Sequence, residues 1–417
     1  MTSVTIASTL AILSYAVVSS TYEVVQMCNS KGADQGRAKL SQCAHLETPS
    51  VDVIVPCFNE DPTILLACLE SIAQQDYSGQ ITVYVIDDGS DNREQLSIVH
   101  SCFKLDSRFS FITLPRNVGK RKAQIQAIRR SVGELILNVD SDTVLNPDVV
   151  RELAEAMQDR AVGAAMGQLS AINRKSTWLT RLIDMEYWLA CNEERSAQAR
   201  FGAVMCCCGP CAMYRRSALS PLLDQYESQY FLGKPSDFGE DRHLTLLMLK
   251  AGYKTAYVSS AVANTVVPDR LVPYLRQQLR WARSTLRDTL LSIGLLPRLN
   301  PYITLDVIGQ NIGPLLLLLS LLMAAAQVFW TDEAPWLTAE IIVAMTLVRC
   351  SVFAIRARQA RFLAFVLHAP INIFLLVPVK AYALLTLRES DWLSRKSPCQ
   401  SGVISAVASS RRNVSLE

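Results

Sequence analysis

The stretch ITVYVIDDGS, from Ile81 to Ser90, decides the fold class. Six β-prone residues end abruptly in two aspartates, a glycine and a serine, which is typical of a buried strand that stops at a turn. Three further runs have the same character, and amphipathic stretches lie between them. We expect strands at 51–56, 81–86, 109–114 and 134–139, and helices at 63–74 and 121–132. This alternation, with strands apolar on both faces, predicts an α/β fold with a mainly parallel sheet covered on each side.

Acidic residues follow two of these predicted strands. Asp87 and Asp88 end one of them, and Asp140-Ser-Asp142 ends another. In such sheets ligands bind at the carboxyl ends of the strands. Residues i and i+2 of an extended backbone point the same way, so Asp140 and Asp142 could approach one hard cation. Mg²⁺ and Mn²⁺ take oxygen ligands and commonly join carboxylates to a diphosphate, whereas a lone pair of this kind can also be a solvated turn.

Two more stretches could complete a site for a nucleotide diphosphate. Lys120-Arg-Lys122 begins a predicted helix, where the lysine and the helix N-terminus both favour phosphate, although a solvated basic turn has the same sequence. Gly239-Glu-Asp241 precedes a predicted helix at 243–250. Asp241 could be a helix cap or a general base that takes a proton from an attacking hydroxyl. Local sequence leaves both interpretations open.

The clearest periodicity lies between Tyr274 and Leu291. Arginines recur there at helical spacing beside a leucine-rich stripe, at 276, 280, 283 and 287. This predicts an amphipathic helix with one basic face, suited to a membrane surface. Gln277, Arg280 and Trp281 within it could be surface and anchor residues.

The C-terminal third predicts membrane spans. An uncharged run from Ile308 to Trp330 is long enough to cross a bilayer. A second span is expected from Trp336 to about Ile355 if Arg349 is accommodated, and a third from Phe362 to about Leu385. Val4 to Val25 predicts an N-terminal span, as an uncleaved signal anchor rather than a cleaved signal peptide. Apolar residues make up 50% of the 417, and a formal net charge of +3 is too small to indicate a nucleic-acid binder.

Charge placement gives an orientation for these spans. Basic residues follow the first span and lie between the last two, at 31, 37, 39, 356, 358 and 361. The rule that cytoplasmic loops carry excess Lys and Arg places residues 26–300 and the 356–361 loop in the cytoplasm. The N-terminus and the tail would then lie outside.

Met205 to Cys211, MCCCGPC, contains the spacing of a thioredoxin dithiol at Cys208 and Cys211. Structural disulfides are rare in the cytoplasm, and a β-prone stretch follows where a thioredoxin needs a helix. A zinc site would need two further ligands, and the sequence holds no second CxxC motif. Folding could still supply them.

Four ordered motifs together resemble the processive, membrane-embedded family 2 glycosyltransferases, which include chitin, hyaluronan and cellulose synthases. They begin at Asp87, Asp140, Gly239 and Gln277, and the resemblance covers roughly residues 50–290. Within this group the chain is most similar to the rhizobial nodulation enzymes that make short chitin oligosaccharides. The resemblance implies a GT-A type, Rossmann-like nucleotide-sugar domain, with one N-terminal and about three C-terminal transmembrane helices.

The resemblance also implies roles for individual residues. The uridine pocket is expected to include Pro56, Phe58, Glu60 and Asp88, with Lys120 and Asp140 also holding the nucleotide sugar. Asp142, with Asp140, would hold Mg²⁺ or Mn²⁺, and Asp241 would be the catalytic base. The diphosphate and acceptor would contact Gln277, Arg280, Trp281, Gly209 and Pro210. Cys206 to Cys211 would line the sugar pocket, with Tyr214-Arg215 as part of its framework.

The implied function is an inverting, processive β-1,4-N-acetylglucosaminyltransferase that uses UDP-GlcNAc to extend a GlcNAc oligosaccharide. Its expected partners are UDP-GlcNAc, the growing GlcNAc oligosaccharide, the lipid bilayer and later oligosaccharide-modifying enzymes or an exporter. No nucleic-acid partner is expected. The expected location is the bacterial inner membrane with a cytoplasmic catalytic domain. Alternatives are a hyaluronan synthase-like or other β-glycan synthase, a membrane-anchored thiol oxidoreductase using Cys208 and Cys211, and a transporter.

The expected division of the chain has five parts. They are an anchor at 1–25, the catalytic domain at 45–265, interfacial helices at 266–303, transmembrane helices at 304–387 and a tail at 388–417.

Overall fold

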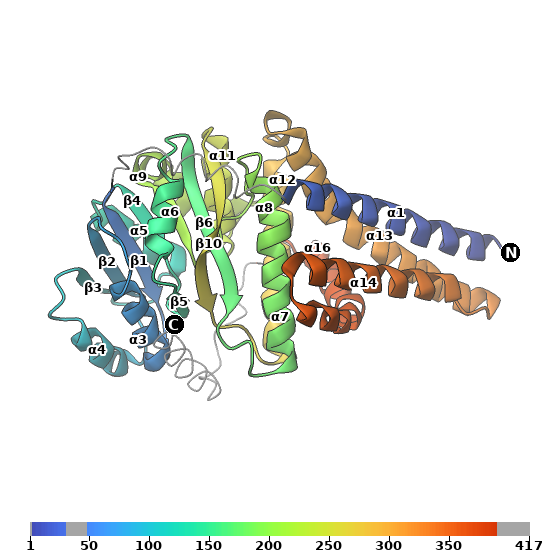
Figure 1. Ribbon diagram of the computed structural model, residues 1–417, viewed down its shortest axis with the longest axis horizontal. Coiled ribbons are helices and arrows are strands. Elements are labelled where there is room, and N and C mark those ends of the chain that lie inside the picture. The colour runs from blue at the N-terminus through green and yellow to red at the C-terminus, as the bar shows by residue number, and fades with distance from the viewer. Residues whose placement is uncertain (1, 31–47, 390–417) are drawn as a thin grey trace. The chain divides into compact units, whose positions relative to one another are not determined.

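The computed structural model describes residues 2–30 and 48–389, and these form two compact units (Figure 1). One, here called the sheet unit, contains Ser30, residues 48–274 and residues 388–389. The other, the helical unit, contains residues 2–29 and 275–387. Lys31, Arg37 and Lys39, which contributed to the predicted orientation, and almost all of the predicted tail lie outside the described residues.

An eight-stranded sheet forms the centre of the sheet unit, in the order β3-β2-β1-β4-β7-β6-β10-β5. The strands are β1 (Val51–Cys57), β2 (Ile81–Asp87), β3 (Phe109–Thr113), β4 (Leu135–Asn138), β5 (Thr143–Leu145), β6 (Val162–Ala171), β7 (Ala212–Arg215) and β10 (Lys254–Thr265), with a separate hairpin of β8 (Tyr230–Phe231) and β9 (Lys234–Pro235). Neighbours β1 to β4 pair in parallel, as do β6 and β10. The predicted mainly parallel α/β sheet is confirmed, with β7 and β5 as antiparallel members.

The register of the parallel strands brings the acidic turns to one edge. Asp87 lies opposite Cys57 on β1 and Thr113 on β3. The backbone N–H of Val139, directly after β4, donates to the carbonyl of Ile54 on β1. The chain therefore leaves β1, β2 and β4 on the same side of the sheet, where ligands bind in folds of this kind.

The sheet unit also contains helices, most of which pack against its sheet (Figure 1). They are α3 (Pro62–Ala73), α4 (Arg93–Cys102), α5 (Lys120–Arg130), α6 (Val149–Ala156), α7 (Trp178–Leu189), the π-helix η1 (Ala190–Arg195), α8 (Ser196–Ala199), α9 (Arg216–Leu219), the 3₁₀-helix η2 (Ser220–Leu222), α10 (Leu223–Glu227) and α11 (Glu240–Lys250). The sequence predicts several of their starts. Asp61 caps α3, because its carboxylate accepts the backbone N–H groups of Thr63 and Ile64.

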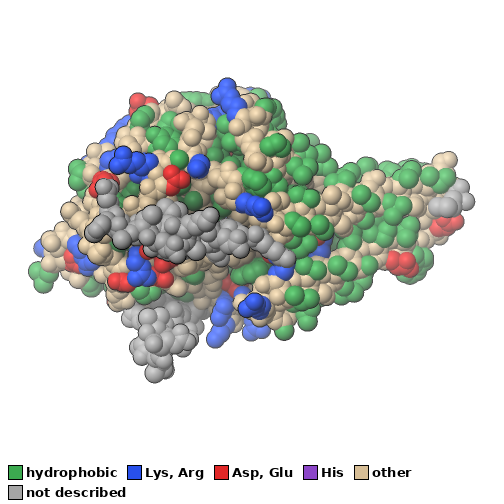
Figure 2. Space-filling model, turned by 45° about the horizontal axis from the view of Figure 1, so that its top comes forward, with side chains coloured by type: hydrophobic (Ala, Val, Ile, Leu, Met, Phe, Trp, Pro, Cys, Tyr) green, Lys and Arg blue, Asp and Glu red, His purple; other side chains and the backbone are tan. Residues whose placement is uncertain are grey.

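The helical unit contains the four predicted spans. Its helices are α1 (Ser3–Ser30), α12 (Leu271–Ser292), η3 (Leu296–Arg298), α13 (Pro301–Thr331), α14 (Trp336–Ala357), η4 (Ala360–Leu367), α15 (His368–Ile371), η5 (Asn372–Leu376) and α16 (Val377–Leu385). The last residue of α1 and the first turn of α12 are assigned to the sheet unit. Four helical segments of the described chain are long and apolar enough to cross a membrane: Ser3–Ser30, Pro301–Thr331, Trp336–Ala357 and Ala360–Leu385. Figure 2 shows hydrophobic side chains along the surface of these helices. The prediction of one N-terminal and three C-terminal helices that could cross a membrane is confirmed.

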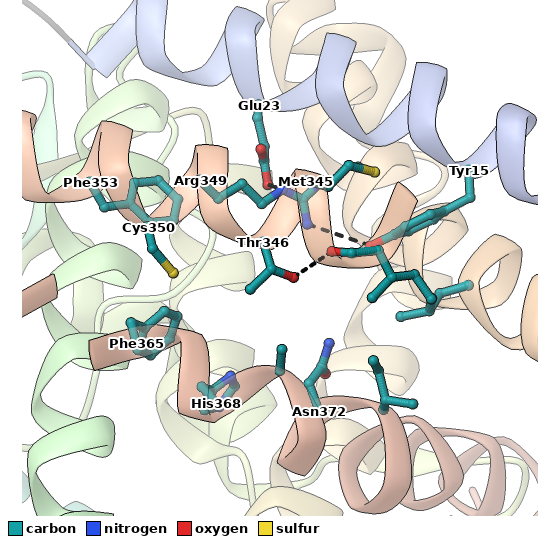
Figure 3. A pocket seen from close by; sticks show the side chains of 14 residues that line it. Tyr15, Glu23, Met345, Thr346, Arg349, Cys350, Phe353, Phe365, His368 and Asn372 are labelled. Carbon is teal, nitrogen blue, oxygen red and sulfur yellow. Dashed lines mark hydrogen bonds and ion pairs between the residues drawn. The ribbon is translucent and has the colours of Figure 1, made fainter. Parts of the chain in front are cut away.

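The charge within the second C-terminal span has a partner. Arg349 of α14 forms an ion pair with Glu23 of α1, with 2.7 Å between Nε and Oε1, and donates a 2.8 Å hydrogen bond to Ser19. Glu23 and Arg349 line a cavity of about 180 Å³, together with Tyr15, His368 and other residues (Figure 3). A charge in a membrane helix is stable only when paired or hydrated, so this contact accommodates Arg349 in its span.

The basic stripe of α12 differs from its prediction. Arg283 and Arg287 are buried rather than exposed on one face. Arg283 donates hydrogen bonds to Thr386 and Arg287 donates one to the carbonyl of Leu387, just beyond α16. Arg283 and Arg287 therefore anchor the end of the last apolar segment. Helical periodicity does not reveal these long-range contacts.

Candidate active site

Lys120 joins two of the acidic motifs of the sheet unit, those that contain Asp140 and Glu240. It is the first residue of α5, and its Nζ lies 2.6 Å from Oδ1 of Asp140 and 2.9 Å from Oε1 of Glu240. Burial favours a neutral amine, but the two carboxylates raise the pKa of Lys120 well above its usual value, so the side chain is cationic. In return, Lys120 outweighs burial and lowers the pKa of Glu240 to about 2. The alternative of a solvated basic turn does not fit Lys120, because this lysine is part of a partly buried charge network.

Asp88 supports the turn that precedes Lys120. Its two carboxylate oxygens accept the backbone N–H groups of Val118 and Gly119, at 2.8 and 2.9 Å. Burial raises the pKa of Asp88 although these two hydrogen bonds oppose the shift. The resemblance implies a uracil contact for this residue, which stays a prediction, and in the structure both oxygens hold the turn before α5.

The residues predicted for the uridine pocket lie at the same edge of the sheet. Pro56 is near the end of β1, and Phe58 and Glu60 follow it. Ser141, inside the Asp140-Ser-Asp142 motif, donates a 2.6 Å hydrogen bond to Oε2 of Glu60. The loop after β1 is thereby tied to the acidic turn after β4.

The acidic triplet is a turn rather than an extended strand. The N–H of Thr143 donates to the carbonyl of Asp140, and one oxygen of Asp142 accepts the hydroxyl of Thr265 at 3.3 Å. The expectation that both carboxylates point the same way on an extended backbone is therefore wrong, because the chain bends at Ser141 before β5. A cation shared by Asp140 and Asp142 would therefore be bound by two side chains of a turn.

Asp241 lies in the first turn of α11, beside Glu240. Its Oδ1 accepts the N–H of Arg242 at 2.8 Å, and its Oδ2 accepts the N–H of Gly209 at 3.1 Å. The cap position belongs to Gly239, with φ of 79°, so the interpretation of Asp241 as the helix cap is wrong. Burial, followed by the charge of Glu240, raises the pKa of Asp241. A half-buried carboxylate with a raised pKa is suited to accept a proton.

Gly209 links Asp241 to the lysine network. A Cβ atom at this position would lie 3.0 Å from Nζ of Lys120 and 3.6 Å from the carboxylate oxygens of Asp140. Gly209 and Pro210 form the centre of a turn that the N–H of Cys211 closes onto the carbonyl of Cys208. A glycine here lets the backbone approach both motifs closely.

Tyr214 and Arg215, which the resemblance implies as part of the sugar framework, contact the protein's own sheet, and their part in a sugar pocket stays a prediction. Tyr214 is buried in the core, and the Arg215 guanidinium donates to the backbone carbonyls of Val162 and Asp159. These contacts attach β7 to the start of β6. Both residues stabilise the sheet, and the part of the motif that faces the site is its glycine turn.

The cysteine-rich stretch contributes two thiols beside Asp241. Sγ of Cys206 lies 3.9 Å from Sγ of Cys208 and 3.9 Å from Oδ2 of Asp241. Arg195, in the π-helix η1, donates to the Cys208 thiol at 3.4 Å. Cys206, Cys208 and Cys211 are not joined in disulfides. The sequence draws attention to Cys208 with Cys211, but the structure groups Cys208 with Cys206, and no local sequence signal connects either thiol to Arg195.

Gln277, Arg280 and Trp281 lie at positions i, i+3 and i+4 of α12, on one side of the helix. They belong to the helical unit, and Trp281 is exposed. Their approach to the site of the sheet unit stays a prediction.

The sheet and its site define a class of enzyme. A mainly parallel sheet with carboxylates and a lysine at its carboxyl edge is the GT-A arrangement of nucleotide-sugar glycosyltransferases. The chain matches two family models, described as glycosyl transferase family 2 over residues 52–223 and chitin synthase over residues 234–395. The first match contains the acidic turns after β2 and β4, and the second contains Asp241 and α12.

Relatives of known name extend over nearly the whole chain. An N-acetylglucosaminyltransferase of Mesorhizobium japonicum is 66% identical over 94% of this chain and 92% of its own length. Enzymes with the same name from a Rhizobium species and from Azorhizobium caulinodans are 64% and 53% identical, over 94% and 95% of this chain and 87% and 100% of their own lengths. The chain belongs to this rhizobial family of N-acetylglucosaminyltransferases within glycosyl transferase family 2.

A solved structure shares the fold. A mannosyltransferase from Pyrobaculum calidifontis, in complex with GDP-Man and Mn²⁺, matches with a TM-score of 0.53 and 20% sequence identity. The match covers 86% of this chain and 99% of the mannosyltransferase. It supports the GT-A fold.

Proposed function

We propose that this protein is an inverting, processive β-1,4-N-acetylglucosaminyltransferase that extends chitin oligosaccharides with GlcNAc units from UDP-GlcNAc. The observation that carries the proposal is the position of Asp241: it lies beside the Gly209 turn and the Lys120 network, and burial raises its pKa. The names of the relatives support GlcNAc as the transferred sugar, and the chitin synthase model over residues 234–395 supports chitin as the product.

Asp241 is the group that begins the proposed reaction. Its carboxylate takes the proton of an acceptor sugar hydroxyl, and the hydroxyl oxygen forms a bond to the anomeric carbon of UDP-GlcNAc. The bond between that carbon and the diphosphate oxygen breaks, and its electron pair leaves with UDP. Attack opposite the leaving group inverts the α configuration of the donor to β in the product.

Gly209 positions the base. Its N–H donates to Oδ2 of Asp241, so the carboxylate is held between this turn and the start of α11. Its backbone also approaches Lys120 closely, and Lys120 is a cation at the N-terminus of α5, where an anion is favoured. Lys120 is therefore the first candidate to contact the diphosphate, once it exchanges a carboxylate partner for a phosphate oxygen.

A divalent cation fits the acidic turn. Asp140 and Asp142 offer carboxylate oxygens at the ligand edge of the sheet, which is the donor set that Mg²⁺ and Mn²⁺ prefer. When bound, such an ion offsets the negative charge that builds on the leaving diphosphate. The mannosyltransferase of similar fold was solved with Mn²⁺.

The rest of the site follows the same assignment. Pro56, Phe58 and Glu60 would border the uridine, and Asp88, which also supports the neighbouring turn, would contact the uracil. Gln277 and Arg280 of α12 would contact the diphosphate, and Trp281 would give the acceptor ring an apolar surface. Gly209 and Pro210 would face the acceptor. We further propose that the four spans cross the bacterial inner membrane and that the sheet unit is cytoplasmic, as the basic residues near the spans indicate.

Product analysis tests the proposal. Membranes carrying the full chain are incubated with UDP-GlcNAc, with and without UDP-glucuronate, and the products are identified by mass spectrometry and linkage analysis. A ladder of β-1,4-linked GlcNAc oligomers that does not change when UDP-glucuronate is added supports the proposal. Products in which glucuronate alternates with GlcNAc would instead indicate a hyaluronan synthase. Sugar transfer that persists in a Cys208→Ser/Cys211→Ser variant rules out the thiol oxidoreductase.

A further inference from the structure

Cys206, Cys208 and Asp241 are the three metal-ligating side chains that the structure brings together, and the assigned mechanism uses one of them. Their ligand atoms all lie within 4.8 Å of one another, and this is the one such group of three His, Cys, Asp or Glu side chains among residues 2–30 and 48–389. The two sulfurs come from one loop and the carboxylate from α11. The carboxylate is the proposed catalytic base.

The distances match those of a bound zinc ion. Tetrahedral zinc holds thiolates at about 2.3 Å, which places two such sulfurs about 3.8 Å apart and a sulfur and a carboxylate oxygen about 3.5 Å apart. The corresponding distances here are both 3.9 Å. A small inward movement of the three side chains would complete three coordination positions and leave the fourth to water or a sugar hydroxyl.

The charges around the cluster also balance. Two thiolates and the Asp241 carboxylate carry three negative charges, which a divalent cation and the Arg195 guanidinium, 3.4 Å from Sγ of Cys208, neutralise together. The hydrogen bond from the Cys206 thiol and the charge of Arg195 hold the pKa of Cys208 at about 7 against the effect of burial. The hydrogen bond to Cys208, burial and the charge of Asp241 raise the pKa of the Cys206 thiol, so a cation that binds both sulfurs has to displace a thiol proton to solvent.

We propose that Cys206, Cys208 and Asp241 form an inhibitory site for a thiophilic divalent cation such as Zn²⁺. An ion bound there occupies the Asp241 oxygen that must accept the acceptor proton, and glycosyl transfer stops. This site is distinct from the all-oxygen site at Asp140 and Asp142, because sulfur ligands select Zn²⁺ or Cd²⁺ and carboxylates select Mg²⁺ or Mn²⁺. The inhibition rests on the proposed function, whereas the binding does not.

Binding is measured first, without reference to activity. The full chain, purified in detergent with excess Mg²⁺, is titrated with Cd²⁺ while the ultraviolet sulfur-to-cadmium charge-transfer absorption is recorded. We expect one Cd²⁺ per chain, with affinity reduced at least about 100-fold in Cys206→Ser and in Cys208→Ser, because even residues outside the ligand set change metal affinity about 10- to 100-fold. The matched control is Cys102→Ser, an exposed thiol of α4, which should bind as the parent does.

Inhibition is measured second. Each variant is assayed with UDP-GlcNAc in buffered Zn²⁺ and compared with its own rate in the absence of Zn²⁺. The parent and Cys102→Ser should share one half-inhibitory concentration, and Cys206→Ser should need at least about 10 times more Zn²⁺. A tenfold increase in Mg²⁺ should leave the half-inhibitory concentration unchanged.

The outcomes separate the two ideas. If Cys206→Ser and Cys208→Ser both bind cadmium as the parent does, the proposed site is overturned. It is also overturned if added Mg²⁺ relieves the inhibition by Zn²⁺. Circular dichroism melting of both serine variants confirms that a loss of binding is not a loss of fold. A normal cadmium titration in a chain that transfers no sugar supports the site and refutes the proposed function.

Discussion

Each unit of the molecule buries an ion pair, and the two pairs are built differently. In the sheet unit Lys120 is shared between Asp140, which follows β4, and Glu240, the first residue of α11. In the helical unit Arg349 pairs with one carboxylate, Glu23, and uses its remaining donors on the hydroxyls of Ser19 and Tyr15. Burying these charges, three in the sheet unit and two in the helical unit, requires the removal of water, which good geometry must offset.

The difference indicates what each pair is for. A lysine with two carboxylate partners can exchange one of them for a phosphate oxygen. Its positive charge then still faces two negative groups. An arginine that joins α1 to α14 within membrane helices has no such alternative, since lipid offers no replacement partner. We infer that the sheet pair is rearranged by substrate and that the helical pair is permanent.

Asp241→Asn is the sharpest way to separate chemistry from charge pairing. The amide keeps the size of the side chain and can still accept the Gly209 N–H, but it cannot take a proton. We expect the turnover rate to fall about 10²- to 10⁴-fold, the usual contribution of a general base. Initial rates with radiolabelled UDP-GlcNAc measure this, with UDP binding as the control for an intact site. Near-normal turnover would contradict the role of Asp241.

Lys120→Met tests whether the sheet pair supports stability as well as function. The change leaves Asp140 and Glu240 without their cation, and we expect the free energy of unfolding to fall by up to about 3 kcal/mol. Adding Glu240→Gln should recover part of that stability but none of the activity. Denaturant titration and sugar transfer are measured on the same preparations. If stability and activity recover together, the pair is structural only.

The pH dependence of the same network has a definite sign. The pKa of Glu240 is lowered from 4.5 to about 2, so its ionised form stabilises the fold above pH 4.5, and this contribution of about 3 kcal/mol is lost as pH falls toward 2. Denaturant titrations of the parent and of Glu240→Gln should differ most at neutral pH and converge in acid. A difference that does not change with pH would mean that Lys120 does not hold this carboxylate ionised.

Arg349→Met tests the helical pair. Removing the cation leaves Glu23 unpaired between membrane helices, and we expect a loss of about 1–2 kcal/mol, near the upper range for polar contacts in bilayers. Thermal unfolding in detergent measures it, with Glu23→Gln/Arg349→Met as the matched double variant that restores stability. A larger effect on the Michaelis constant for UDP-GlcNAc than on unfolding would contradict a purely structural pair.

Gly209→Ala makes the smallest change to the site. The new methyl group would lie 3.0 Å from Nζ of Lys120, so the lysine must shift by a few tenths of an ångström. We expect a decrease of several-fold in turnover with unfolding changed by less than about 0.5 kcal/mol. Gly294→Ala, with no atom within 4 Å of its Cβ, is the control. Equal effects of the two changes would remove Gly209 from the site.

The sequence predicts the parts of this molecule that depend on local patterns. Strand runs that end in aspartates locate the ligand edge, and uncharged runs locate the four spans, because periodicity and hydropathy act over neighbouring residues. Asp241 is within reach of sequence analysis because the motif around it resembles that of a known family.

The remaining features depend on contacts between distant residues. Lys120 meets Glu240 across 120 positions, and Arg287 meets the end of α16 across 100, so no pattern around either residue reveals its partner. The same holds for Cys206, which lies 35 residues from Asp241. The contacts of Asp88 are also difficult to predict from sequence, because its two hydrogen bonds to backbone N–H groups depend on the path of the turn after β3.

The central claim is that Asp241 begins the transfer of GlcNAc from UDP-GlcNAc to a growing oligosaccharide. Mass spectrometry of products from membranes with equal amounts of the parent chain and of Asp241→Asn tests it most directly. The account predicts a ladder of β-1,4-linked GlcNAc oligomers from the parent and none above background from the variant. A parent that makes no such oligomers, or a variant that makes the same ladder at the same rate, would contradict it.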